Sequence, residues 1–137
     1  SIEVATLIKQ IKTLKELKSP DIVKVVFDYN NFALYFSRSP IPFTRKAVSD
    51  SAALEITDYY KHIGLYVFRR KSLLKFISLK QTDLEKTEML EQLRMLENGI
   101  RIKVVETEFE SISVDTQEDL KRARTFYKWL QKREKEK

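Results

Sequence analysis

The sequence predicts an α/β protein, a layered fold in which helices cover a mixed sheet. Strand-like runs alternate with helical ones, two short strands flank a tight turn, and 137 residues suit a single domain, 1–137. Hydrophobic residues make up 42% and aromatic residues 11%, which is too apolar for a disordered segment. The chain is therefore expected to fold around a sizeable core.

The first sixty residues are predicted to form a helix, a β-hairpin and a long loop. Apolar residues recur at helical spacing across 4–17, which favours an amphipathic helix. Residues 22–27 and 32–36 are apolar runs joined by turn formers, which predicts two paired strands. The prolines in 38–42 favour an extended loop, and 43–61 is expected to be a surface excursion with a short helix.

The middle of the chain is predicted to alternate strand and helix. Residues 62–68 form a strand-like run with alternate aliphatic residues on one face, and 71–79 take a helical spacing. Thr82 and Glu85 have capping-box spacing at the start of a longer helix, which Asn98-Gly99 closes. The sequence therefore predicts a strand followed by two helices.

The last third is predicted to contain two strands and a helix. Residues 100–105 alternate as a strand, 111–115 form a short one, and Thr116 is a suitable N-cap for the final helix. Lysine and arginine number 26 against 20 acidic residues, a net charge of +6 that raises the question of a polyanion partner. Acidic residues alternate with lysines across 128–137, which favours a solvated helix end and no nucleic-acid partner.

Composition excludes several classes of site. Cysteine is absent, so disulfides, thiolate nucleophiles and cysteine zinc sites are excluded. Gly64 and Gly99 are the only glycines, which leaves no place for a glycine-rich phosphate loop. No apolar run approaches the ~20 residues that cross a bilayer, and no signal-peptide pattern opens the chain. We expect a soluble, cytoplasmic protein with no membrane partner.

Asp115 is the first candidate for chemistry, because it ends a predicted strand directly before a helix. Sheets of α/β proteins position ligand and metal groups at such ends. Its carboxylate would suit Mg²⁺, a hard ion that shares oxygen ligands with phosphates. The alternative is that Asp115 only helps to cap the helix, and its position alone favours that alternative.

Two aromatic side chains of 62–68 form a second candidate group. His62 is the only histidine, which argues against a Ser-His-Asp relay or a histidine-rich metal site. Single histidines are usually structural, but on a strand that faces a pocket His62 could donate a hydrogen bond to a sugar hydroxyl. Tyr66 lies four residues further along, so both side chains leave from the same face.

Further polar residues follow the hairpin and lie on the longer helix. Arg38 precedes the proline-stiffened loop, where its guanidinium could hold a carboxylate in bidentate fashion or simply lie at the surface. Glu88, Glu91 and Gln92 are three and four residues apart, so Glu88 is expected to share a helix face with the other two. Such clusters usually face solvent, but turned toward a cleft they would suit a polyhydroxylated ligand.

Four blocks of sequence resemble the CMP-Kdo synthetases, in which Kdo is 3-deoxy-D-manno-octulosonate. The blocks are ALYFSRSPIPF (33–43), KHIGLYVFR (61–69), TEMLEQLRMLENG (87–99) and SVDTQEDLKRAR (113–124). Their order and spacing match the family over nearly the whole chain. The resemblance implies the C-terminal portion of a nucleotide-diphospho-sugar-transferase-like domain, with sugar-binding and dimer-forming elements.

The resemblance also implies a reaction, in which the anomeric hydroxyl of Kdo attacks the α-phosphorus of CTP. CMP-Kdo and pyrophosphate are formed for lipopolysaccharide biosynthesis, Mg²⁺ is required, and family members are generally homodimers. Asp115 matches the catalytic aspartate that joins a second aspartate in holding the metal. Five residues match positions associated with the Kdo pocket: Arg38, His62, Tyr66, Glu91 and Gln92.

The chain departs from the family pattern in two ways. Before the last helix, Ser113 replaces a glycine and Gln117 a proline of the family motif. Loss of the proline forfeits some pre-organisation of the helix start, but neither change removes a metal ligand. The loop that grips CTP and the other metal aspartate do not occur in these 137 residues. The chain is therefore expected to lack the N-terminal nucleotide-binding half and to be inactive alone.

Several hypotheses for function follow. The chain is part of a CMP-Kdo synthetase, or it is a catalytically inactive module for sugar binding and dimerisation. It could also belong to a sibling sugar cytidylyltransferase, such as those for sialic acids. A basic nucleic-acid-binding domain rests on charge alone and would bind with a steep dependence on salt.

Overall fold

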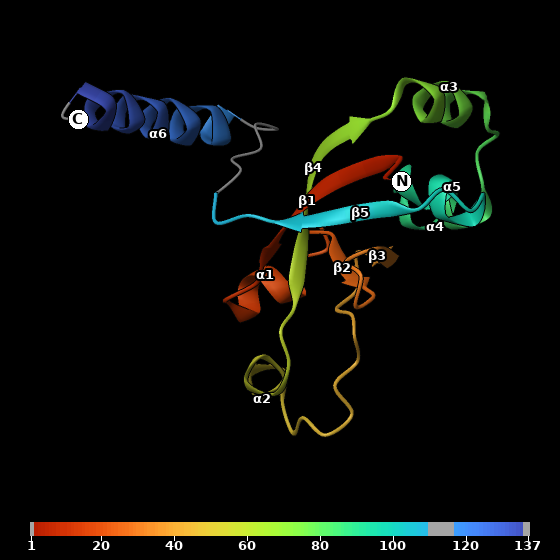
Figure 1. Cartoon of the computed structure of the whole chain (residues 1–137). Helices are drawn as coiled ribbons and strands as arrows, with labels where there is room; N and C mark the ends of the chain where they lie inside the picture. Colours follow the sequence, from red (N-terminus) through yellow and green to blue (C-terminus); the bar gives the residue numbers. More distant parts are fainter. Residues whose placement is uncertain (1, 110–116, 136–137) are drawn as a thin grey trace.

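The computed structural model describes residues 2–109 and 117–135, and a five-stranded sheet lies at its centre (Figure 1). The strands are β1 (Val4–Gln10), β2 (Lys24–Phe27), β3 (Ala33–Ser37), β4 (Tyr60–Phe68) and β5 (Ile102–Glu106), in the spatial order β3-β2-β4-β1-β5. β1 pairs in parallel with β5 and antiparallel with β4, and β2 pairs antiparallel with β3 and β4. The α/β class and the mixed sheet predicted from the sequence are confirmed.

The described residues also form helices, which are α1 (Leu14–Lys18), α2 (Asp50–Ile56), α3 (Arg70–Ser78), α4 (Asp83–Glu88), α5 (Gln92–Glu97) and α6 (Gln117–Lys135). In Figure 1, α3, α4 and α5 lie together near one end of the sheet, α1 and α2 lie toward the other end, and α6 stands apart from the strands. None of these helices is both long and apolar enough to cross a membrane. The strand predicted at 111–115 and the N-cap predicted at Thr116 lie outside the described residues.

The helix predicted across 4–17 is wrong, because these residues form strand β1 and then the short helix α1. Val4, Thr6 and Ile8 are β-branched, alternate along the strand and are all buried. β4 pairs with one edge of this strand and β5 with the other. Pairing on both sides therefore outweighs the helical spacing of the other apolar residues.

The predicted hairpin is confirmed as β2 and β3, and one carboxylate organises its turn. Asp28 Oδ1 accepts hydrogen bonds from the backbone N–H groups of Asn30 and Phe32, at 2.9 and 2.8 Å. Asn31 has a left-handed φ of 56°, a conformation that asparagine tolerates better than most residues. The bond from Phe32 is the largest cause that lowers the pKa of Asp28, so the charged carboxylate is the form that holds the turn.

The long helix predicted after Thr82 begins as expected and then breaks in two. The Thr82 N–H donates to the Glu85 carboxylate at 3.3 Å, which is one bond of the predicted capping box. Met89 then adopts a left-handed φ of 55° and ends α4, and α5 starts at Gln92. Gly99 closes α5 with a φ of 72°, as its position predicted. A single helix through this region is therefore wrong, and the break creates a corner between α4 and α5.

The main core packs one face of the sheet against the α4–α5 region. Its buried apolar side chains come from β1, β2, β3, β5, α5 and the loops around α5. A smaller cluster of Ile11, Leu17, Ala53 and Tyr59 joins α1 and α2 to the start of β4. Each fully buried aliphatic or aromatic side chain contributes roughly 1.5–3 kcal/mol. The sheet and the α4–α5 corner are therefore held together tightly enough to fix side chains between them.

Candidate functional site

A cavity of about 440 Å³ opens where the sheet meets the α4–α5 corner, a volume typical of small-molecule sites. It is lined by the segment before β2, the residue after β3, the first half of β4 and the corner itself. Four of the five predicted sugar-site residues line it: Arg38, His62, Glu91 and Gln92. The fifth, Tyr66, has its ring centroid 5.3 Å from that of His62. The fold thus brings together residues that are 54 positions apart in the sequence, since the first is Arg38 and the last is Gln92.

A bulge in β4 keeps His62 and Tyr66 on one face of the sheet. Ile63 pairs with Leu7 and Tyr66 pairs with Thr6, so residues 64 and 65 have no partner on β1. Because two residues are inserted, the alternation of side chains is preserved across the bulge, and both rings lie on one face, as predicted. That face is the core side, where Tyr66 packs against the main core and His62 against Phe36. The alternate aliphatic residues of the strand lie on the other face, where Leu65 and Val67 are 54% and 64% exposed.

The His62 imidazole is enclosed by rings and is uncharged at neutral pH. Its centroid lies 5.0 Å from that of Phe36 in an edge-to-face arrangement. Nε2 lies 2.9 Å from the hydroxyl of Thr6 on the adjacent strand. Burial lowers the pKa of His62 from its ordinary value of 6.5 to about 4, because an imidazolium would lose its hydration there.

The lowered pKa of His62 predicts a dependence of stability on pH. Between pH 6.5 and about 4 only the unfolded chain binds the proton, so the free energy of unfolding should fall as the pH is lowered through this window. A pKa shift of this size corresponds to a loss of roughly 3 kcal/mol in the free energy of unfolding over the whole window. Urea denaturation of the wild type and of His62→Gln at pH 7, 5.5 and 4 separates this effect from carboxylate titration. Equal pH slopes for the two proteins would contradict the prediction.

The Tyr66 hydroxyl is buried and has no hydrogen-bond partner within the described residues. Burial, with a further contribution from the nearby Glu91 carboxylate, raises the pKa of Tyr66, so the phenol keeps its proton. An unpaired buried hydroxyl costs roughly 1–3 kcal/mol. A ligand oxygen that accepted this proton would recover that cost.

Gln92 also offers hydrogen-bonding capacity to the cavity. It is 2% exposed, lines the cavity, and its amide makes no hydrogen bond to other described residues. A primary amide both donates and accepts, which suits vicinal hydroxyls. The polar atoms of Tyr66 and Gln92 are therefore available for a ligand that carries several hydroxyl groups.

Arg38 is engaged largely with the backbone around the corner. Its Nε donates to Glu88 O at 2.8 Å, Nη1 to Pro20 O at 2.9 Å and Nη2 to Met89 O at 3.3 Å. In an unbroken helix these Glu88 and Met89 carbonyls would accept from backbone N–H groups four residues on. The guanidinium thus replaces helix bonds at the break, and two of its five N–H donors make no bond to the residues that the structure describes.

The expectation that Glu88 shares a helix face with Glu91 and Gln92 is wrong. Glu88 ends α4, and its carboxylate accepts from the Ser37 hydroxyl at 2.6 Å and from the Arg38 backbone N–H at 2.9 Å. Glu91 and Gln92 follow the left-handed Met89 and line the cavity. The break in the helix therefore separates a structural carboxylate from two cavity residues.

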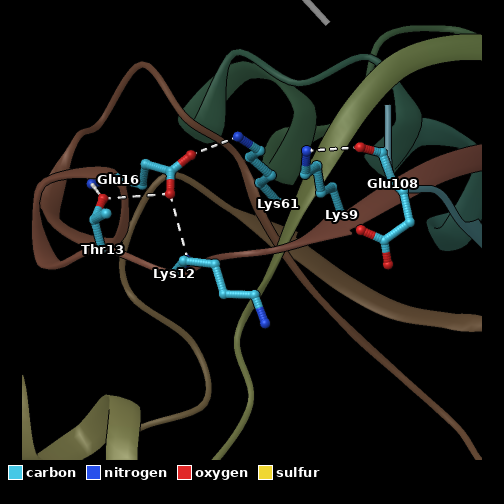
Figure 2. A network of polar contacts seen from close by, with 6 residues as sticks. All are labelled: Lys9, Lys12, Thr13, Glu16, Lys61 and Glu108. Carbon is cyan, nitrogen blue, oxygen red and sulfur yellow. Dashed lines mark hydrogen bonds and ion pairs between the residues drawn. The ribbon is translucent and has the colours of Figure 1, made fainter. Parts of the chain in front are cut away.

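A network of lysines and a glutamate borders the cavity on the side of α1. Figure 2 shows Glu16 between Lys61, Thr13 and the backbone of Lys12, with Lys9 reaching the carbonyl of Glu108. Lys61 Nζ lies 2.5 Å from Glu16 Oε1. Burial alone would raise the pKa of Glu16, but the Lys61 ammonium together with hydrogen bonds from Lys12 and Thr13 outweighs it, and the pKa is lowered. Lys61, which also lines the cavity, is thereby held in place from α1.

Comparison with known proteins agrees with this arrangement. Residues 2–102 match the family described as "Cytidylyltransferase". The chain belongs to the cytidylyltransferase family. This cytidylyltransferase chain is 52% identical over 135 residues to the 3-deoxy-manno-octulosonate cytidylyltransferase of Pelobacter propionicus, covering 96% of the chain and 53% of that relative. It is 50% identical to the protein of the same name from Flavobacterium johnsoniae, covering 90% of the chain and 48% of that relative.

A solved structure is also similar to this cytidylyltransferase chain. It is CMP:2-keto-3-deoxy-manno-octonic acid synthetase in complex with CTP, with a TM-score of 0.83 and 37% identity. The match covers 94% of the chain and 50% of that structure. The chain thus spans about half the length of the relatives that it matches.

Asp115, the predicted metal ligand of this cytidylyltransferase chain, lies outside the described residues. Within the part of the chain that the structure describes, no three histidine, aspartate or glutamate side chains are grouped to hold a metal ion.

Three residues that support the cavity were missed by the sequence analysis: Thr6, Lys24 and Phe36. Lys24 is fully buried, and its Nζ donates to the carbonyls of Ser19 and Ile22 at 2.9 and 2.6 Å. A lysine within an apolar strand run was the available signal for it. The role of Thr6 was not predicted because residues 4–17 were expected to form a helix. Phe36 could not be told apart from an ordinary core residue in the sequence.

Proposed function

We propose that this chain supplies the sugar pocket for transfer of CMP from CTP to Kdo, which yields CMP-Kdo and pyrophosphate for lipopolysaccharide biosynthesis. The observation that supports this most directly is the cavity at the α4–α5 corner, which gathers four of the five predicted sugar-site residues. Beside them lies the Tyr66 hydroxyl, which has no partner in the part of the chain that the structure describes. The named relatives at 50–52% identity act on the same octulosonate according to their names.

The chemistry of the cavity suits an acid sugar. Tyr66 offers a hydroxyl without a partner among the described residues, and Gln92 an amide that both donates and accepts. His62 offers an uncharged ring, and Glu91 a carboxylate that accepts from hydroxyls. Arg38 and Lys61 place positive charge at the same cavity, which favours a ligand carboxylate.

Nucleotide binding is assigned to residues outside this chain. These 137 residues include two glycines in all, and neither lies in a phosphate loop motif. We propose that the segment which the relatives have and this chain does not span holds CTP, and that Asp115 shares a Mg²⁺ ion with an aspartate there. The metal would neutralise charge on the phosphates. The single domain is proposed to be the C-terminal portion of this enzyme and to form homodimers.

Calorimetry with Kdo tests the proposal. The wild-type chain is expected to bind Kdo more tightly than a sialic acid, and Tyr66→Phe should weaken Kdo binding about tenfold because a ligand acceptor loses its partner. Tyr127→Phe is the matched control, since Tyr127 is 61% exposed on α6 and should leave the affinity unchanged. Absence of Kdo binding, or tighter binding of the sialic acid, would refute the assignment.

A further inference from the structure

The hydroxyl of Thr6 meets three polar groups of β4 at the bulge. Thr6 Oγ1 lies 2.9 Å from His62 Nε2, 2.9 Å from Leu65 O and 3.2 Å from Ile63 O. Thr6 is 2% exposed, so these contacts are made away from water. The hydroxyl thus occupies the point where the bulge opens the ladder between β1 and β4.

A hydroxyl has one proton, and this fixes the direction of each bond. The carbonyls of Ile63 and Leu65 are acceptors only, so the hydroxyl proton must point toward them. Had it pointed at His62 instead, two carbonyl oxygens would face the hydroxyl oxygen in a buried place with no proton between them, which is costly. The remaining contact, between Oγ1 and Nε2, is then a bond in which Nε2–H donates.

The protonated Nε2 leaves Nδ1 as the unprotonated nitrogen of the neutral ring. Nε2 is bonded to Thr6, which does not line the cavity, whereas His62 does. Nδ1 makes no hydrogen bond to other described residues. The nitrogen available to the cavity is therefore Nδ1, and it carries a lone pair.

We propose that Thr6 is a positioning residue that fixes His62 as the Nε2–H tautomer, so that Nδ1 accepts a hydrogen bond from a hydroxyl of the bound sugar. This inference rests on the proposed function, and it reverses the role suggested by the sequence, in which His62 donates. A ligand must then present a hydroxyl hydrogen at this point. A carbonyl or carboxylate oxygen there would face the lone pair of Nδ1 and be rejected.

The tautomer can be read directly, because His62 is the only histidine of the chain. Long-range ¹H–¹⁵N correlation spectra at pH 7 are expected to show one imidazole with a protonated Nε2 and an unprotonated Nδ1. Thr6→Val, which removes the hydroxyl, should give a mixture of tautomers, and Thr6→Ser should restore the wild-type spectrum. A wild-type ring protonated at Nδ1, or an unchanged tautomer in Thr6→Val, would overturn the proposal. If Thr6→Val does not fold, the wild-type and Thr6→Ser spectra still decide the tautomer.

Titration with Kdo tests the acceptor role. A bond from a sugar hydroxyl should shift the Nδ1 resonance upfield, and Thr6→Val should bind Kdo about tenfold more weakly while Thr6→Ser stays within about twofold of the wild type. Binding without any change at Nδ1 would overturn the acceptor role. Complete absence of Kdo binding, together with the expected tautomer in the free chain, would instead refute the proposed function and leave the role of Thr6 in fixing the tautomer intact.

Discussion

Replacing Arg94 by methionine is expected to lower the free energy of unfolding by about 3 kcal/mol, the lower end of the range for breaking a buried ion pair. The Glu85 carboxylate accepts from Arg94 Nε at 2.7 Å and also from Nη2, and Glu85 is 4% exposed. Arg94 keeps 20% exposure of its side chain, which places the effect at the lower end. The Arg94 guanidinium lies over the ring of Phe76, and methionine retains an apolar contact there. The loss of stability therefore reports on removal of the positive charge.

Lys86→Met is the matched control, on helix α4, which also carries Glu85. Lys86 pairs with Asp83 at 3.4 Å, and both side chains are exposed, at 55% and 97%. Exposed pairs of this kind contribute roughly 0–1 kcal/mol, so the control should unfold close to the wild-type urea midpoint. Urea denaturation followed by circular dichroism measures both variants. Equal losses in the two would mean that burial of the Glu85–Arg94 pair is not what stabilises the corner.

The second large effect is expected from Phe36→Ala, which should cost about 3–5 kcal/mol of stability. Phe36 is fully buried at the centre of the main core, and its ring also supports the edge of the His62 imidazole at 5.0 Å. The variant should therefore lose affinity for Kdo as well as stability. Thermal denaturation and calorimetry measure the two losses separately.

Phe43→Ala is the control for the loss of a phenylalanine ring. Phe43 is 88% exposed, so its removal should change stability by no more than about 0.5 kcal/mol. Unchanged Kdo binding in Phe36→Ala, despite the loss of stability, would show that the His62 ring is held by Thr6 alone.

Local patterns predicted most of the fold, and tertiary pairing explains where they failed. The hairpin of β2 and β3, strands β4 and β5 and helix α6 follow from alternation, turn formers and helical spacing. The prediction of a helix in place of β1 failed because the apolar residues of this segment fit both a helical and a strand periodicity. Only the pairing with β4 and β5 decides between the two. The helix break at Met89 was not predicted, because the carbonyls at the break bond to Arg38, which lies 51 positions away in the sequence.

Residue type and spacing singled out the candidate site residues, and only the resemblance assigned them to one sugar pocket. Their surroundings could not be predicted from the sequence. Arg38, His62, Glu91 and Gln92 carry no periodic signal that would place them in one cavity. The contact between Thr6 and the bulge carbonyls requires the register of β1 against β4, which a single sequence does not encode locally. Long-range contacts of this kind appear only once the strands are paired.

Helix α6 has a practical consequence for spectroscopy. Trp129, the single tryptophan of the sequence, lies on this helix, stacked on Phe126 at 5.6 Å with the Arg133 guanidinium 4.8 Å from its ring. Since α6 stands apart from the strands in Figure 1, indole emission reports on that helix and is insensitive to melting of the sheet. Any quenching of this fluorophore therefore signals an event at α6, such as association with another surface.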